Sequence, residues 1–467
     1  MIDQAQVSYK ASKHHEIEFR RASCIETSMI ASILILLSLA PGGFAQTAAS
    51  PYQVGTWQGF RSAAVSYTFD DNLPNQLAIA IPMFDQFGFK VTLFTVTGPS
   101  SVWPWPANWS GLQKAAAEGH EIASHTITHP NFSSLADSLQ QQELELSQDT
   151  INAHIPGHQC ITIAYPYCVS GNEAIDANYY IAGRGCSGQI VSTTPSDFMN
   201  ISSFVLGDQG TNTVAGIESI ANSAASQNGW CVYLIHGING TEPGAYSPIS
   251  QDTVLATVGY LYANPTRFWV APFGTVARYI KERNSASVSQ LLDYGDSVTV
   301  QLTDNLDSAY YNVPLAIRRP LPTGWDSASV CQNGDTVNSE IVRVDTVKYI
   351  MFDAVPNAGN ITLVNESGTV VGVRDGFSSP ATFELLQNYP NPFNPTTKIE
   401  YFVAKYGYVS LKVDNVLGEE VATLFSGIRQ AGNYIATFDG NALASGVYFY
   451  RLSAGGGYIT RKLLLMK

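Results

Sequence analysis

The stretch Ala63-Ala-Val-Ser-Tyr-Thr-Phe-Asp-Asp71 is an apolar run that ends on two neighbouring carboxylates. Its first seven residues predict a buried β-strand. Neighbouring residues of a strand point to opposite faces, so a strand continuing through both aspartates would bury one unpaired charge. At the C-terminal end of the strand the backbone can turn and direct both to one site, where α/β barrels carry catalytic groups. Alone, the pair is more typical of a solvated turn, here the turn before Pro74.

Strand-like and helix-like segments alternate around this run. The predicted strands are Ala63–Phe69, Lys90–Val96, Trp230–Ile235 and Arg267–Ala271, and the predicted helices are Asn75–Phe87, Ser110–Glu118, Ser134–His154 and Asp252–Asn264. Such alternation predicts an α/β fold with parallel strands, either a barrel or a doubly wound sheet, over residues 54–286.

The rest of the chain reads as two small all-β units, residues 287–376 and 383–467. Short strand candidates separated by turn residues, such as Ser297–Leu302 and Gly446–Leu452, recur in both. The segment Asn388–Pro395 holds three prolines, which predicts extended chain outside a sheet.

The N-terminal residues 1–45 are predicted to be an extension and a secretory signal peptide. Arg20 and Arg21 precede the apolar run Met29–Leu39, and Ala45 offers a small residue for cleavage. The run is too short for a membrane span, so we expect none in the mature chain. The net charge of −13 argues against a nucleic-acid partner. Of the cysteines that follow, Cys168 and Cys186 are one possible disulfide pair, and the sequence does not decide the pairing.

Two histidines supply a candidate metal site. His125 and His129 are four residues apart, a spacing that places both on one face of a helical turn. With Asp71 they make a two-histidine, one-carboxylate set that leaves coordination positions for water and substrate. Asp70 is then free to accept a proton from that water.

Three further features extend the candidate site. His236 follows an apolar strand and suits a general acid. The turn Ala164-Tyr-Pro-Tyr-Cys168 offers backbone N–H groups to an oxyanion. Trp103 and Trp105 suit either stacking on sugar rings or loop packing.

In this order, the motifs resemble polysaccharide deacetylases of carbohydrate esterase family 4, the NodB-homology enzymes. The residues that carry the resemblance are Thr68–Asp71, Gly119–Ile122 leading into His125 and His129, Pro166-Tyr167, and Leu234 with His236. The resemblance implies a distorted (β/α) barrel and removal of acetyl groups from N- or O-acetylated glycans.

The resemblance also implies roles for individual residues. Asp70 would be the general base, His236 the general acid, and the Tyr167 N–H the oxyanion donor. Asp71, His125 and His129 would bind a divalent metal, usually Zn²⁺ but also Co²⁺ or Ni²⁺, and Leu234 would line the acetyl pocket. Ala164 replaces the arginine of the family's third motif, and the Asp of the fourth is absent from its expected place. We take Arg184 as the substitute for the missing charge.

The C-terminal unit resembles the sorting domain of the type IX secretion system. The resemblance rests on Asn388–Pro395, Asn415–Gly418, Leu443–Tyr448 and the basic end Lys462–Lys467. It implies the type IX machinery as a partner and a secreted or cell-surface location.

Three other functions remain open at this point. A non-haem iron oxygenase also uses two histidines and a carboxylate, but leaves Asp70 and His236 without roles. A glycosidase needs two carboxylates on either side of the scissile glycosidic bond, and adjacent residues such as Asp70 and Asp71 are poorly suited to that arrangement. A catalytically inactive cell-surface glycan-binding protein is suggested by Ala164.

Overall fold

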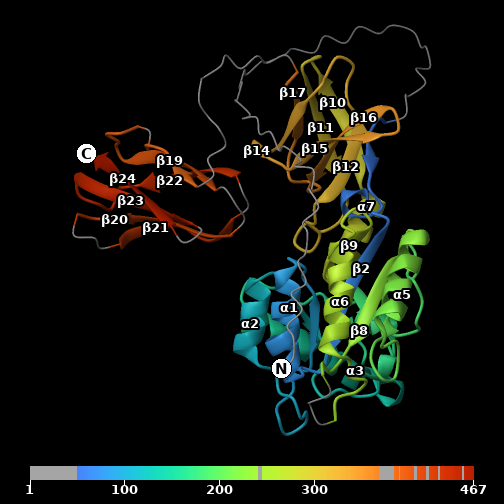
Figure 1. Ribbon diagram of the computed structural model, residues 1–467. Coiled ribbons are helices and arrows are strands. Elements are labelled where there is room, and N and C mark those ends of the chain that lie inside the picture. Colours follow the sequence, from blue (N-terminus) through green and yellow to red (C-terminus); the bar gives the residue numbers. More distant parts are fainter. Residues whose placement is uncertain are drawn as a thin grey trace, which may run out of the picture. The chain divides into compact units, whose positions relative to one another are not determined.

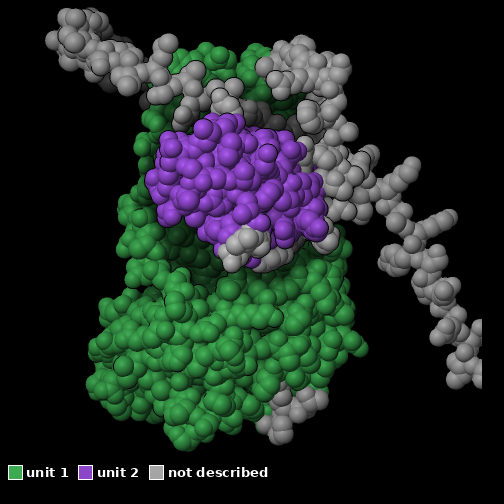
Figure 2. Space-filling view, turned by 90° about the vertical axis from the view of Figure 1, so that its left-hand side faces the viewer, with its two compact units in different colours: residues 1–368 green, residues 369–467 purple. Residues whose placement is uncertain are grey.

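The structure is a computed structural model that describes residues 50–239, 244–367, 383–388, 390–403, 407–416, 420–429, 432–454 and 457–467. The contact pattern divides the chain into two compact units, residues 1–368 and 369–467 (Figure 2). The predicted signal peptide lies outside the described residues. Within the described ranges, no helix is long and apolar enough to cross a membrane.

A parallel sheet forms the centre of the α/β region of the first unit, and its strands β2, β8 and β9 are labelled in Figure 1. Its strand order is β6-β5-β4-β3-β2-β8-β7, with β9 paired to β2. Its strands are β2 (Ala63–Asp70), β3 (Thr92–Thr95), β4 (Glu121–Ser124), β5 (Thr162–Ala164), β6 (Ala182–Arg184), β7 (Phe204–Val205), β8 (Trp230–Ile235) and β9 (Phe268–Val270). Strands β2 and β8 are buried along their whole length, which explains why they read as continuous apolar runs.

Helices connect these strands. They are a π-helical turn (Gln76–Ala80) that continues into α1 (Ile81–Gln86), then α2 (Trp109–Ala117), α3 (Asp137–His154), α4 (Glu173–Asp176), α5 (Val214–Ser226), α6 (Gln251–Tyr262) and α7 (Phe273–Ser285). All strand pairings within this sheet are parallel, so the carboxyl ends of its strands meet at one edge.

A β-sandwich completes the first unit. The strand order of one sheet is β1 (Gln53–Val54), β12 (Leu315–Pro320), β16 (Val347–Ala354) and β15 (Ser339–Val344). The strand order of the other sheet is β10 (Ser287–Asp293), β11 (Ser297–Thr303), β17 (Ile361–Asn365), β13 (Ala328–Gln332) and β14 (Asp335–Thr336). Inward-facing side chains such as Val300, Ile317 and Leu363 are fully buried between the sheets.

The sandwich shares its core with the parallel-sheet region. Tyr279 of α7 is buried in the sandwich core and donates a hydrogen bond to the Gly55 carbonyl, 2.8 Å away. Glu282 of the same helix is buried and accepts from the Val313 N–H at 3.1 Å. Strand β1, which precedes the parallel sheet in the chain, pairs with β12 of the sandwich. The chain therefore enters and leaves the α/β region through the sandwich.

The second unit is strand-rich. Its smaller sheet contains β18 (Glu384–Leu385), β19 (Thr396–Val403) and β22 (Gly432–Asp439), and its larger sheet β21 (Glu420–Arg429), β20 (Gly407–Asp414), β23 (Gly446–Ala454) and β24 (Gly457–Leu465). Phe393 of the proline-rich segment is buried in its core. The predicted fold class, a distorted barrel followed by two small β units, is confirmed.

Candidate metal centre

The carboxyl edge of the parallel sheet gathers most of the predicted site residues. Asp70 ends β2 and Asp71 follows it, His125 follows β4, Arg184 ends β6, and Leu234 and His236 lie at and just after the end of β8. The parallel register brings strands that are distant in sequence side by side, with Thr68 beside both Thr92 and Leu234.

A turn in left-handed backbone conformation directs Asp71 into the site. Asp71 and Asn72 have φ values of 80° and 63°. Asn72 tolerates this conformation better than most residues with a Cβ, and its side-chain amide donates to the carbonyls of Val96 (2.7 Å) and Trp105 (3.1 Å).

The histidine pair lies in a loop, and our prediction of a helical turn is wrong. Thr126 and His129 have φ values of 68° and 55°, which no α-helix contains. The loop closes through the His129 N–H, which donates to Thr126 Oγ1 at 3.0 Å. Glu143 of α3 accepts from the N–H groups of Ile127 and Thr128 at 2.7 and 2.9 Å. The two rings meet because side chains hold this loop, not because of helical periodicity.

Asp71, His125 and His129 form the candidate ion site. Their ligand atoms lie within 4.8 Å of one another. Asp71 Oδ1 is 3.4 Å from His125 Nε2 and 3.5 Å from His129 Nε2. That oxygen is buried without a well-formed hydrogen bond among the described residues. The Ala164 carbonyl oxygen lies 2.7 Å from His125 Nδ1, so a proton on Nδ1 leaves Nε2 as the ligand atom.

The electrostatics of the centre favour a cation. Burial, with the charge of His125, lowers the pKa of His129 to about 4, so its ring is neutral and can bind a metal at neutral pH. Burial opposes ionisation of Asp71, but the histidines around it, His125 foremost, hold its pKa below the ordinary value. Burial opposes the charged form of His125 too, yet Asp70 and Asp71 raise its pKa overall.

Arg184 pairs with Asp70. The guanidinium donates through Nη2 to Asp70 Oδ2, and its Nη1 donates to Ser203 Oγ at 3.2 Å. Both partners are buried, with Arg184 only 1% exposed. The arginine therefore lies behind the carboxylate.

The turn that carries Tyr167 is joined to the Arg184 strand by a disulfide. Tyr167 and Cys168 have φ values of 57° and 61°, and Cys168 is bonded to Cys186. We find no acceptor for the Tyr167 N–H among the described residues. The Tyr167 ring is 64% exposed and packs edge-on against His129.

His236 lies beside the centre, and Leu234 is buried two residues before it in the chain. Leu234 is 2% exposed, and His236 Nε2 is 3.8 Å from Asp71 Oδ2. Burial lowers the pKa of His236, against the opposing effect of Asp70 and Asp71. The Gln76 side chain donates to the His236 carbonyl at 3.0 Å.

Trp103 is part of the site, and Trp105 lies beside it. The Trp103 ring stacks on His129 with centroids 4.4 Å apart, and its Nε1 donates to the Asp71 carbonyl at 3.0 Å. Trp105 contacts Trp103 edge-on at 5.8 Å. Sequence reasoning missed Tyr246, whose ring packs against His236, and Ser203, because neither belongs to a recognisable motif.

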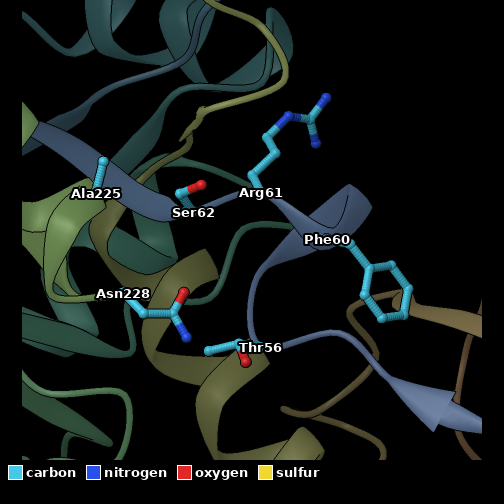
Figure 3. A pocket seen from close by; sticks show the side chains of 6 residues that line it. All are labelled: Thr56, Phe60, Arg61, Ser62, Ala225 and Asn228. Carbon is cyan, nitrogen blue, oxygen red and sulfur yellow. The ribbon is translucent and has the colours of Figure 1, made fainter. Parts of the chain in front are cut away.

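A hollow elsewhere on the first unit contains none of these residues. It is lined by Thr56, Phe60, Arg61, Ser62, Ala225 and Asn228 (Figure 3). Ser62 immediately precedes β2, so the hollow lies at the amino end of the strand whose carboxyl end bears Asp70. It is separate from the candidate centre.

Two family models match this chain. The model described as polysaccharide deacetylase matches residues 59–179, and the model described as secretion system C-terminal sorting domain matches residues 387–466. The chain therefore carries a polysaccharide deacetylase domain of the NodB type, carbohydrate esterase family 4, and a C-terminal sorting domain. Both predicted resemblances are confirmed.

Individual relatives extend the comparison. A gellan lyase from a Bacillus species is 28% identical over 344 residues, which is 69% of this chain and 14% of that protein. This chain thus spans about one seventh of its curated relative.

One similar solved structure is the carbohydrate esterase domain of a multidomain xylanase from the hindgut metagenome of Trinervitermes trinervoides. The sequences are 18% identical, the match covers 46% of this chain and 88% of that chain, and the TM-score is 0.33. A peptidoglycan deacetylase from Bacillus subtilis has 15% identity, covers 50% of this chain and 95% of that chain, and has a TM-score of 0.33.

Proposed function

We propose that this protein is an exported, metal-dependent deacetylase that removes acetyl groups from N- or O-acetylated glycans. The deacetylase domain supports hydrolysis of acetyl amide or ester bonds. The observation that carries the metal dependence is the convergence of both histidine Nε2 atoms on Asp71 Oδ1.

The residues present fit a divalent ion. Asp70 and Asp71 bring two carboxylates into a buried site where Arg184 pairs with only one of them, so the site accommodates further positive charge. Two imidazoles and a carboxylate are ligands that suit Zn²⁺, and also Co²⁺ or Ni²⁺. When bound, such an ion polarises a carbonyl and lowers the pKa of water.

The protein groups around the metal position each carry out a different step of the hydrolysis. Asp70 takes a proton from the attacking water, whose oxygen forms a bond to the acetyl carbonyl carbon. The Tyr167 N–H donates to the carbonyl oxygen as negative charge develops there. His236 delivers a proton to the departing nitrogen or oxygen as its bond to the acetyl carbon breaks. The products are acetate and a free amino or hydroxyl group on the sugar.

Arg184 acts in this proposal as a positioning residue for Asp70. Its guanidinium orients that carboxylate through a charge-assisted hydrogen bond, without facing the substrate. It thus supplies the charge that Ala164 does not. The glycan-binding alternative was motivated by that missing arginine, and the Arg184–Asp70 pair weakens it. In this proposal, Leu234 lines the acetyl pocket, and Trp103 and Trp105 contact sugar.

Acetate release from purified full-length protein tests the activity. We would supply Zn²⁺ and compare acetylated chitooligosaccharide, peptidoglycan, acetylated xylan and acylated gellan, the last because the curated relative is a gellan lyase. We expect release from at least one glycan and a loss of at least about 100-fold in Asp70→Asn. Equal behaviour of wild type and Asp70→Asn, with no acetate formed, favours the inactive glycan-binding protein.

Export is proposed to use the signal peptide and then the type IX machinery, with delivery to the cell surface or the medium. The sorting-domain match supports the second step. Deleting residues 383–467 is expected to retain the protein in the periplasm. Surface delivery of the shortened protein argues against this route.

A further inference from the structure

A tyrosine on the loop after β8 lies against the proposed acid. The Tyr246 ring meets the His236 imidazole edge to face, with centroids 5.0 Å apart and an interplanar angle of 77°. Half of the Tyr246 side chain, 50%, remains exposed. The ring therefore has one part in contact with the site and another available to a ligand.

Backbone hydrogen bonds hold the two ends of this loop together. The Asn239 N–H donates to the Ile249 carbonyl at 2.8 Å, and the Ile249 N–H donates to the Gly237 carbonyl at 3.0 Å. The Asn239 side chain also accepts from the Gln251 N–H at 2.8 Å, at the start of α6. The loop thus begins and ends at one fixed point beside His236.

Ser247 anchors the loop next to the tyrosine. Its hydroxyl donates to the Leu206 carbonyl and accepts from the Gln209 N–H, both at 3.0 Å, and the residue is 3% exposed. A Cβ on Gly207 would lie 2.0 Å from the Ser247 carbonyl oxygen, so only glycine permits this approach. The position of Tyr246 is consequently determined by its neighbour.

The same loop reaches the tryptophans. A Cβ on Gly244 would lie 3.8 Å from the Trp105 ring, which is ordinary contact distance. Trp105 in turn contacts Trp103, which stacks on His129. Aromatic rings therefore lie against both His129 and His236, and the loop that carries Tyr246 comes close to Trp105.

From this geometry, and resting on the proposed function, we infer that Tyr246 binds the sugar ring bearing the departing amine or hydroxyl. His236 must approach that departing atom, so the sugar lies within reach of the ring beside His236. A tyrosine offers a rigid apolar face to pyranose C–H groups and a hydroxyl to their oxygens, at little conformational entropy cost. Tyr246 is thus a specificity-determining residue that favours acetylated sugars over simple acetyl esters.

Substrate comparison on the full chain tests this inference. Tyr246→Ala is assayed with acetylated chitotetraose and with 4-nitrophenyl acetate, which carries no sugar. We expect kcat/KM to fall about tenfold for the oligosaccharide and to change less than about twofold for the ester. Tyr246→Phe is expected to retain most of the oligosaccharide activity. Tyr294→Ala is the matched control, because Tyr294 is 69% exposed and belongs to the sandwich.

Two results overturn the inference. An equal loss on both substrates means that Tyr246 acts through His236, and an unchanged oligosaccharide kcat/KM means that it does not contact sugar. Calorimetric binding of the oligosaccharide separates this inference from the proposed function. If wild type binds the oligosaccharide without releasing acetate, the proposed activity fails, and weaker binding by Tyr246→Ala still supports the sugar contact.

Discussion

Arg184 and Asp70 are separated by 114 positions in the sequence and form a buried ion pair at the ends of two strands. Removing the cation leaves a buried carboxylate without its ion-pair partner and without the hydrogen bond that orients it. We expect Arg184→Ala to lower kcat about 100-fold, and Arg184→Lys to recover part of it. Wild-type kcat in Arg184→Ala contradicts the positioning role.

Metal binding provides a prediction independent of turnover. His125→Ala and His129→Ala each remove one ligand atom from the centre. We expect elemental analysis to show near-stoichiometric zinc in wild type and little in either variant. Zinc at about 100 times its Kd should stabilise wild type by about 2.7 kcal/mol and the variants far less. His158→Ala is a control, since His158 bonds the Ile122 carbonyl and is outside the centre. Unchanged zinc content in His125→Ala refutes the ligand assignment.

The Cys168–Cys186 disulfide is expected to support both stability and the Tyr167 turn. It closes a loop with a sequence separation of 18 residues. Loss of a loop-closing bond of this size reduces unfolding free energy by about 3 kcal/mol. We expect Cys168→Ser/Cys186→Ser to unfold at lower denaturant and to have several-fold lower kcat. Reductant should lower wild-type activity but leave the double variant unchanged. Full activity of the double variant shows that the turn does not need the bond.

Glu282 should make stability depend on pH. Burial raises the pKa of its carboxyl from 4.5 to about 7. Because the folded pKa is higher than the unfolded one, the stabilising contribution is complete below about pH 4.5 and is lost as pH rises through about 7. Glu282→Gln removes this titration, so its Tm relative to wild type should increase between about pH 5 and about pH 8. A constant Tm difference across that range rules out this role for Glu282.

The α/β region should depend on the sandwich for its folding. A fragment of residues 50–286 would expose Tyr279 and Glu282 and leave β1 without β12. We expect that fragment to aggregate or to melt well below a fragment of residues 50–367, as measured by light scattering and thermal unfolding. Equal melting temperatures contradict this dependence.

The central strands of the parallel sheet could be predicted because they are buried on both faces. Trp230–Ile235 is an uninterrupted apolar run and is found as β8 with the same bounds. Asp70, Asp71 and His236 could be placed at one edge because each follows such a run. The proposed metal ligands could be predicted from residue type and order, although the helical turn expected for His125 and His129 does not exist.

Other features could not be read from the sequence because they depend on tertiary contacts. The two residues of β1 show no periodicity, and their strand exists only through pairing with β12. The Ala164 carbonyl that orients His125 is a backbone group, so no residue type reveals it. Ser203 and Tyr246 join the site through segments without motifs, and their roles appear only once the strands are assembled.

The pairing of β1 with β12 has a consequence for how this protein can be divided or recombined. The sandwich holds the deacetylase region at both of its chain ends. The two regions are therefore expected to be transferred between proteins together. A graft of the catalytic strands into another host needs Gln53–Val54 and the sandwich with it. The loops at the opposite, carboxyl edge are free of that requirement, so new substrate preferences can arise there without rebuilding the scaffold.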